Sequence, residues 1–293
     1  MSSSQETSES ESSLDSPISF PSPRLGVSAF NSDPLSRRHM LRATTGALLA
    51  LSLPLPATEP PPSFRFVVIN DVHCRDERCH PWFRKIVADI RTHHPDFILI
   101  NGDLSDNGLP GQLSAVKNIF GSLGVPLYAT VGNHDYATDN GHAPFDQIFP
   151  GSVNYHFQHA GWQFIGLDST HNREVFFTLI QAPTLAWLDA TLPTLDRTKP
   201  TVICTHFPLG DGVLCRPLNA GALLDRFDGF NLCGAFSGHW HGYAEHHFEH
   251  ASVTNSRCGS WWRPNHDGSP EKGYHLCQAT STGPLRHQFC VVS

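Results

Sequence analysis

From residue 64 onward, short apolar runs alternate with amphipathic segments, and this alternation constrains the fold more than any other feature of the chain. Apolar, β-branched runs predict buried strands over 64–70, 96–102, 126–133, 201–207 and 233–239. Apolar residues at helical spacing predict helices over 81–94, 113–123, 182–195 and around 220–228. Two further runs, 153–157 and 162–168, predict a strand pair, and only strand-like pieces follow His241. The order favours an α/β fold in which two stacked sheets are flanked by helices.

Composition agrees with a folded domain and directs attention to metal chemistry. Hydrophobic residues make up 39% of the 293 residues and charged residues 16%, which is typical of a globular protein. The 20 Lys and Arg residues are outnumbered by 27 Asp and Glu residues, giving a net charge of -7, so general nucleic-acid binding is not expected. The 19 His residues are the unusual count, because imidazole is the commonest metal-ligating side chain.

The N-terminal part of the chain differs from the rest. Residues 1–35 are rich in Ser, Glu and Pro and are predicted to be disordered. Residues 36–57 contain the Arg37-Arg38 pair, an apolar run of about 13 residues and a small residue, and resemble a bacterial twin-arginine signal peptide. This predicts export to the periplasm without a transmembrane anchor; the alternative is a chance Arg pair before a membrane-anchoring helix. A Pro-rich spacer, 58–63, then precedes one domain, 64–293.

Asp, Asn and His residues follow the predicted strands at the point where each strand ends. They are Asp71, His73, Asp103, Asp106, Asn133, His134, Asp135, His206, His239 and His241. Because ligands of open α/β sheets gather beyond the carboxyl ends of the strands, we expect these side chains to lie close together. A single His at a strand end is more often structural, but five consecutive polar strand ends favour a functional site.

The residue types at these positions fit one kind of chemistry. Carboxylate, amide and imidazole donors without thiolates suit Mn, Fe or Zn. Seven candidate ligands are too many for one ion and about right for two ions that share a carboxylate. Two ions roughly 3.5–4 Å apart can clamp the attacking and leaving oxygens of a phosphoryl displacement and activate a water molecule. We therefore expect a small phosphoester substrate.

The ordered blocks Asp-x-His, Gly-Asp-x-x-Asp, Gly-Asn-His-Asp, a single His and Gly-His-x-His resemble the calcineurin-like metallophosphoesterase superfamily, from Asp71 to His241. The resemblance implies a four-layer α/β/β/α sandwich of two mixed β-sheets. It also implies in-line attack by a metal-bridged hydroxide. The related purple acid phosphatases have Tyr at the position of Asp106, so the Asp argues against a charge-transfer Fe(III) site.

The same resemblance implies a role for each residue of the blocks. It assigns the first metal to Asp71, His73 and His241, the bridge to Asp103, and the second metal to Asn133, His206 and His239. It assigns His134 as the acid that protonates the leaving oxygen, with Asp106 orienting it. A His near its own pKa is a good proton donor at neutral pH.

Several residues outside this set keep alternatives open. Asp135 is interpreted as a turn cap rather than a ligand. Trp261 and Trp262 could stack a base at the site or pack as a plug under the second sheet, and Cys74 and Cys79 form either a disulfide or two free thiols. One of four loop arginines could grip the phosphate, namely Arg173, Arg216, Arg257 or Arg263.

The sequence thus predicts an exported, dinuclear-metal phosphoesterase. The absence of a large cap insertion favours phosphodiesters or small nucleotides over phosphomonoesters, which stay an alternative. A non-catalytic metal-binding module is the alternative from another class, and no H-E-x-x-H helix supports a metalloprotease. Metal identity and oligomeric state do not follow from the sequence.

Overall fold

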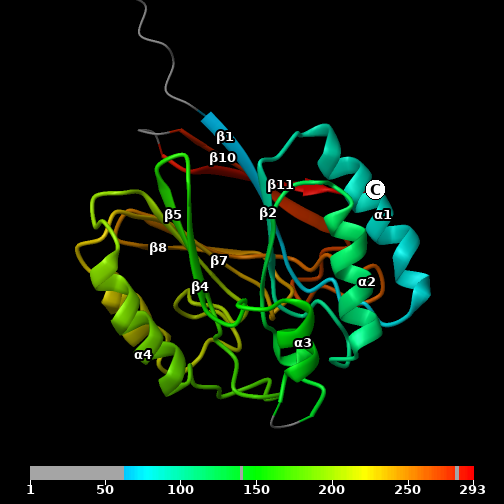
Figure 1. Cartoon of the computed structure of the whole chain (residues 1–293), viewed down its shortest axis with the longest axis horizontal. Coiled ribbons are helices and arrows are strands. Elements are labelled where there is room, and N and C mark those ends of the chain that lie inside the picture. The colour runs from blue at the N-terminus through cyan, green and yellow to red at the C-terminus, as the bar shows by residue number, and fades with distance from the viewer. Residues whose placement is uncertain (1–62, 139–140, 281–283) are drawn as a thin grey trace, which may run out of the picture. The chain divides into compact units, whose positions relative to one another are not determined.

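A computed structural model describes residues 63–138, 141–280 and 284–293 (Figure 1). The predicted disordered segment, signal peptide and nearly all of the spacer lie outside these residues. Ser63, which we expected in the spacer, already belongs to strand β1 because its backbone pairs with Thr280. No helix among the described residues has the length and apolar character needed to cross a membrane.

The first sheet has five strands in the order β11-β10-β1-β2-β3. Their bounds are β1 Ser63–Ile69, β2 Phe97–Asn101, β3 Leu127–Thr130, β10 Gly273–Thr280 and β11 Arg286–Val291. The pairs β1–β2 and β2–β3 are parallel, whereas β10 is antiparallel to both β1 and β11. The parallel strands therefore bring three carboxyl ends to one edge of the sheet.

The second sheet has six strands in the order β4-β5-β6-β7-β9-β8. Their bounds are β4 Tyr155–His159, β5 Trp162–Leu167, β6 Thr201–Thr205, β7 Leu232–Ser237, β8 Ala244–Phe248 and β9 Ala251–Asn255. Strands β5, β6, β7 and β9 are parallel, and β4 and β8 are antiparallel edge strands. Both sheets are mixed, as predicted.

An aromatic layer fills the space between the two sheets. Phe66 and Phe97 of the first sheet pack against Phe164 of the second, with ring centroids 5.2 and 5.0 Å apart. These rings are almost completely buried. Such rings contribute large buried apolar areas, so the two sheets are held face to face by the hydrophobic effect.

Helices cover the two outer faces and complete the four layers (Figure 1). The first sheet is covered by α1 (His80–Thr92), α2 (Pro110–Gly121) and α3 (Ala143–Ile148) through one apolar cluster. The second sheet is covered by α4 (Ala182–Thr191) and α5 (Ala220–Leu224) through another. The predicted α/β/β/α sandwich is therefore confirmed.

The helix boundaries differ from the predictions where proline or short length decides. Helix α2 begins at Pro110, three residues before the predicted start, because proline suits the first turn of a helix. Helix α4 ends at Thr191, and the turn Leu192–Thr194 that follows it is a 3-10 helix. The sequence pattern does not predict α3, because a helix of only six residues shows no clear helical period.

The cysteines correct one alternative. All eight lie in the described part of the chain and are free thiols, so the disulfide between Cys74 and Cys79 is wrong. The Cys79 sulfur instead accepts hydrogen bonds from the Arg75 amide and the Trp261 indole, both at 3.3 Å. Two non-covalent contacts thus hold Cys79 in this loop, in agreement with the alternative of two free thiols.

Candidate metal centre

The seven predicted ligands come together where three strands of the first sheet and two strands of the second sheet end. They follow β1 (Asp71 and His73), β2 (Asp103), β3 (Asn133), β6 (His206) and β7 (His239 and His241). All seven are buried, and none exposes more than 9% of its surface. Burying this many polar groups is unfavourable unless they bind one another or a cation, so the arrangement points to a cation site.

The backbone of the ligands is unusual. Five of the seven have a positive φ, namely Asp71 (53°), His73 (46°), Asp103 (51°), His239 (63°) and His241 (49°). Non-glycine residues adopt this left-handed region at an energetic cost, and such strain gathers at functional sites. The strand ends are therefore shaped to aim these side chains.

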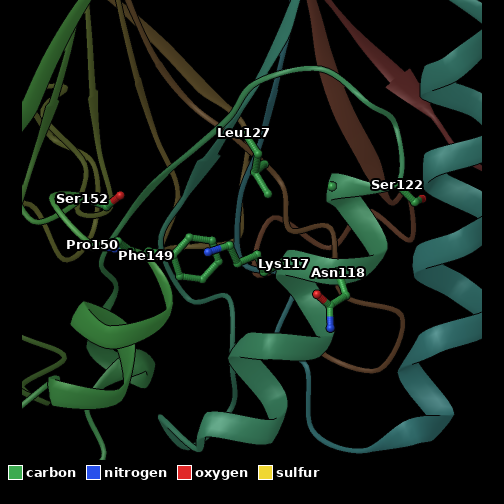
Figure 2. A pocket seen from close by; sticks show the side chains of 8 residues that line it. Lys117, Asn118, Ser122, Leu127, Phe149, Pro150 and Ser152 are labelled. Carbon is green, nitrogen blue, oxygen red and sulfur yellow. The ribbon is translucent and has the colours of Figure 1, made fainter.

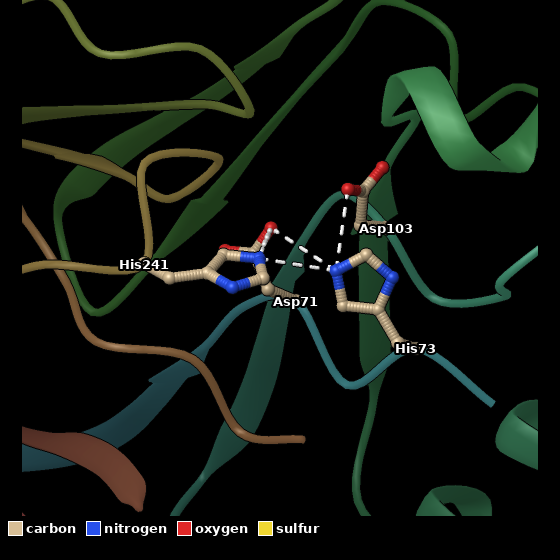
Figure 3. A group of neighbouring side chains, drawn as sticks. All are labelled: Asp71, His73, Asp103 and His241. Carbon is tan, nitrogen blue, oxygen red and sulfur yellow. Dashed lines mark hydrogen bonds and ion pairs between the residues drawn. The ribbon is translucent and has the colours of Figure 1, made fainter. Parts of the chain in front are cut away.

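The first group consists of Asp71, His73, Asp103 and His241 (Figure 3). The Nε2 atoms of His73 and His241 face each other at 3.1 Å. A carboxylate oxygen of Asp71 lies 3.2 Å from His241 Nε2, and one of Asp103 lies 3.5 Å from His73 Nε2. Four donor atoms thus point toward one small volume.

The second group consists of Asp103, His206 and His239, with Asn133 beside them. His206 Nε2 lies 3.3 Å from Asp103 Oδ1, 3.2 Å from His239 Nδ1 and 3.0 Å from Asn133 Oδ1. Asp103 belongs to both groups, so its carboxylate lies where a ligand shared by two ions would be.

Hydrogen bonds to the main chain orient three of the four histidines. His206 Nδ1 donates to the Asn101 carbonyl at 3.1 Å, His239 Nε2 to that of Val175 at 3.0 Å, and His241 Nδ1 to that of Pro264 at 3.2 Å. Because a carbonyl can only accept, the N–H of each ring is directed away from the cluster. In the neutral rings, the other nitrogen presents a lone pair to the cluster, as metal-ligating histidines do.

His73 is held differently. Its Nδ1 is buried without a hydrogen bond within the described residues and faces Asp106 Oδ1 at 3.7 Å. Burial lowers the pKa of His73 to about 4, despite the carboxylates of Asp106 and Asp103. A neutral His73 can therefore offer its Nε2 lone pair to a cation at neutral pH.

The donor set fits divalent cations. Two ligand atoms bound to one tetrahedral Zn ion lie roughly 3.3–3.4 Å apart, close to the 3.1 and 3.2 Å between the facing imidazole nitrogens. Burial raises the pKa of Asp71, but His241 and His206 outweigh it and lower that pKa to about 2, so the carboxylate is ionised. Imidazole, carboxylate and amide donors together suit Mn, Fe or Zn.

Gly238 allows the Asp71 carboxylate to lie in direct contact with the main chain. A Cβ on Gly238 would lie 2.2 Å from Asp71 Oδ2, within the space that this oxygen occupies. The amide of His239, the next residue, donates to the same oxygen at 2.9 Å. The Gly of the Gly-His-x-His block is thus required by the approach of Asp71.

His134 and Asp106 lie beside the ligands, but their contact differs from the expected one. His134 Nδ1 donates to the Asp106 main-chain carbonyl at 2.9 Å, whereas the Asp106 carboxylate is 3.9 Å away. That carboxylate instead binds Arg263 Nη2 at 2.5 Å. Asp106 thus contacts the His134 ring most closely through its main-chain carbonyl, and its orienting role stays a prediction.

Arg263 is the one of the four predicted arginines that binds a residue of the site. Arg257 is paired with Asp267 and Glu271, and Arg216 donates to the Leu209 carbonyl. Arg173 is exposed. The sequence could not single out Arg263, because the pairing partner Asp106 lies 157 residues earlier in the chain.

Hydrogen bonds show what Asp135 and Trp262 contact. Asp135 is completely buried and accepts from the amides of Leu104, Ser105 and Gly132, so it is a turn cap, as interpreted. The Trp262 indole donates to the His73 carbonyl at 3.0 Å. Trp262 therefore packs against the first metal loop, not under the second sheet.

Figure 2 shows the side chains that line a separate cavity. It is lined by Lys117, Asn118, Gly121, Ser122, Leu127, Phe149, Pro150 and Ser152. Leu127 begins β3, whereas the ligand Asn133 follows the end of that strand. The cavity contains none of the seven ligands, so it is not part of the candidate metal centre.

An α/β/β/α sandwich with a buried Asp/His/Asn cluster at its strand ends defines the class of metal-dependent phosphoesterases. A family model described as calcineurin-like phosphoesterase matches residues 64–243, so the chain belongs to this family.

Curated relatives and a solved structure agree with this membership. The chain is 35% identical over 116 residues, 39% of its length and 41% of the relative, to a 3',5'-cyclic-nucleotide phosphodiesterase of Nostoc sp.. It is 30% identical over 161 residues, 49% of its length and 57% of the relative, to a probable cyclic nucleotide phosphodiesterase of Moraxella catarrhalis. The chain thus spans about half the length of these relatives. A dimetal phosphatase of Danio rerio shares the fold, with a TM-score of 0.60 at 15% identity over 80% of this chain and 100% of that chain.

Proposed function

We propose that this protein is a dinuclear-metal phosphodiesterase that hydrolyses small phosphodiesters, cyclic nucleotides among them. The observation that carries the proposal is the position of Asp103, whose carboxylate belongs to both groups of candidate ligands. The names of the relatives from Nostoc sp. and Moraxella catarrhalis support a phosphodiester substrate.

In this proposal the seven side chains hold two cations. Asp71, His73 and His241 would hold one, Asn133, His206 and His239 the other, and Asp103 would bind both. When bound, such a pair supplies an activated water molecule and neutralises charge on the phosphoryl group. The protein contributes the fixed orientation of the imidazoles, which the hydrogen bonds to main-chain carbonyls provide.

His134 would protonate the leaving oxygen. Its side chain is 26% exposed, unlike the buried ligands, and its ring lies 4.8 Å from that of His73. Because Nδ1 donates to the Asp106 carbonyl, a protonated ring can release only its Nε2 proton without losing this contact. The leaving alkoxide would thus receive a proton from a ring that keeps its orientation.

The first experiment measures metal content and substrate preference. We expect two metal equivalents per chain by elemental analysis. Of bis-p-nitrophenyl phosphate, cyclic AMP and p-nitrophenyl phosphate, we expect the two diesters to be hydrolysed faster. Preference for the monoester would instead indicate a phosphomonoesterase, and binding of metal without turnover of any substrate would indicate a metal-binding module.

His134→Ala tests the acid directly. The nitrophenolate leaving group needs little protonation, whereas the ribose alkoxide of cyclic AMP needs a proton. His134→Ala should therefore reduce hydrolysis of cyclic AMP about a hundredfold or more, and that of bis-p-nitrophenyl phosphate much less, with metal content unchanged. His156→Ala, an exposed histidine of β4, is the matched control and should leave both rates unchanged. Equal losses on both substrates would contradict the assigned role.

We also propose that the protein is exported through the twin-arginine pathway. The proposal rests on Arg37-Arg38 and the apolar run that follows, all of which precede the described residues. Replacing both arginines by lysine should leave the precursor in the cytoplasm of a bacterial host. Continued processing of that variant would refute the pathway.

A further inference from the structure

Exposed apolar side chains are concentrated in one part of the chain, which contacts a candidate metal ligand through the backbone of Val175. Ten large apolar side chains are exposed in the part of the chain that the structure describes, and six of them come from two short segments. We call these six residues the apolar rim: Val175, Phe176, Phe177, Leu179, Leu214 and Leu218. Single exposed apolar residues are ordinary, whereas a group of six from two joined segments is the kind of surface that binds a partner or a ligand.

Hydrogen bonds join the two segments into one surface. The Leu218 amide donates to the Thr178 carbonyl at 2.9 Å. The Asn219 side chain accepts from the Ile180 amide at 2.8 Å and donates to the Ile180 carbonyl at 2.9 Å. The rim residues on either side of these bonds are therefore held next to one another.

The rim is attached to a candidate metal ligand. The carbonyl of Val175, its first residue, accepts the Nε2 proton of His239 at 3.0 Å. The opposite nitrogen of the same ring, Nδ1, faces the second group of ligands through His206 at 3.2 Å. One imidazole ring thus lies between the backbone of the rim segment and the second group of candidate ligands.

The backbone conformation of Phe177 indicates that packing of the fold alone does not account for the exposed rim. Phe177 is 84% exposed and has a φ of 54°. A bulky residue in the left-handed region is strained, and an exposed ring gains nothing from burial in return. Strain that folding does not explain is expected where a surface serves binding.

We propose that the apolar rim binds an apolar ester group of an amphiphilic phosphodiester whose phosphate lies at the metal centre. The proposal rests on the proposed function and narrows its substrate class. The charged residues in and next to the two segments are two cations and two anions, namely Arg173, Glu174, Asp211 and Arg216. Because they balance, the two segments carry no excess positive charge that would favour an anionic membrane or a second phosphate, and apolar contact is what they offer.

A homologous series of substrates isolates this contact. Each substrate is a p-nitrophenyl phosphodiester, and the second ester group is methyl, butyl or octyl, used as dissolved monomers. The leaving group and the chemical step are the same throughout. A methylene fully removed from water gains roughly a fourfold factor in binding. For a rim that covers one side of the chain, we expect kcat/KM to rise at least about tenfold from methyl to octyl.

Rim variants then test the residues. Phe176→Ser combined with Phe177→Ser should abolish the dependence on chain length and leave hydrolysis of the methyl ester unchanged. Val291→Ser is the matched control, because Val291 is 47% exposed at the end of β11 and lies outside the rim. A length dependence that persists in the double variant, or that is absent from the parent protein while the methyl ester is hydrolysed, would overturn the proposal.

A binding measurement on metal-free protein separates the rim from catalysis. Octyl phosphate should displace a neutral fluorescent apolar dye from the parent protein, whereas methyl phosphate should not, and the double variant should bind the dye several-fold more weakly. Dye binding can be measured even if the protein hydrolyses no diester. In that case the proposed function would be wrong, but the apolar rim would still be supported as a binding surface. Dye binding equal in parent and double variant would refute the rim. A dimer that the parent protein forms in sedimentation experiments and the double variant does not form would also refute the proposal, because the rim would then be a dimer interface.

Discussion

Arg263 Nη2 lies 2.5 Å from Asp106 Oδ1, and this ion pair connects the loop between β9 and β10 to the metal centre. The same oxygen faces His73 Nδ1 at 3.7 Å and His134 Nδ1 at 3.9 Å. Burial raises the pKa of Asp106, but His73 and Arg263 outweigh it and lower that pKa to about 2. The Asp106 carboxylate therefore lies between a cation, a candidate ligand and the candidate acid, and both His73 and Arg263 favour its ionised form.

Arg263→Gln should disturb both neighbours of Asp106. Without the cation the pKa of Asp106 rises, so the carboxylate becomes protonated at a higher pH and the acid limb of the pH–rate profile moves upward. We expect kcat/KM for phosphodiesters to fall about tenfold or more, as losses of outer-shell partners do. Arg257→Gln is the control, because Arg257 is paired with Asp267 and Glu271 in the same loop. An acid limb that shifts equally in both variants would contradict this role.

Gly238→Ala should weaken the first group of ligands without unfolding the protein. The added methyl group would lie 2.2 Å from Asp71 Oδ2, so this carboxylate must move. We expect metal content to fall by about one equivalent per chain. Gly111→Ala is the control, since Gly111 lies in α2 with open space around it and alanine favours helices. Full metal content in Gly238→Ala would contradict this expectation.

Binding of metal should release a proton from His206. Burial opposes protonation of this ring, but Asp103 and Asp71 outweigh it and raise the pKa of His206 to about 9 in the metal-free protein. At neutral pH the ring is therefore protonated, and a cation must displace that proton. Metal affinity should therefore rise as pH increases from 7 toward 9. Calorimetry in buffers of different ionisation enthalpy measures the released protons, and an affinity independent of pH between 7 and 9 would contradict the expectation.

The sequence was sufficient for the layers of the fold, because each buried strand is a continuous apolar run with a clear polar end. It was also sufficient to predict that the seven candidate ligands lie close together, since polar residues beyond the carboxyl ends of strands gather at one site. The contact of Arg263 with Asp106 could not be predicted, because it depends on how a loop 157 residues away folds back onto the site. The same holds for the His239–Val175 contact, which involves a main-chain carbonyl that any residue type would offer.

Asp135 should contribute to stability even when no metal is bound. Its carboxylate accepts from the amides of Leu104, Ser105 and Gly132 and from the Ser105 hydroxyl, so it joins the loop after β2 to the loop after β3. Asp135→Ala leaves these buried donors without partners, and we expect a loss of about 2–4 kcal/mol in the free energy of unfolding. Urea unfolding in the presence of a chelator measures it.

The control for Asp135→Ala is Asp189→Ala, which removes a carboxylate from the exposed pair with Arg226 and should cost less than about 1 kcal/mol. Comparing unfolding with and without the chelator distinguishes two possible roles of Asp135. If it holds the loops directly, the loss persists without metal, because the orphaned amides are present in either state. If Asp135 acts only by positioning Asp103 and Asn133 for a cation, the loss of unfolding free energy is seen with metal bound and disappears when the chelator removes the metal. Because its hydrogen bonds lie within the two loops, we expect the first outcome.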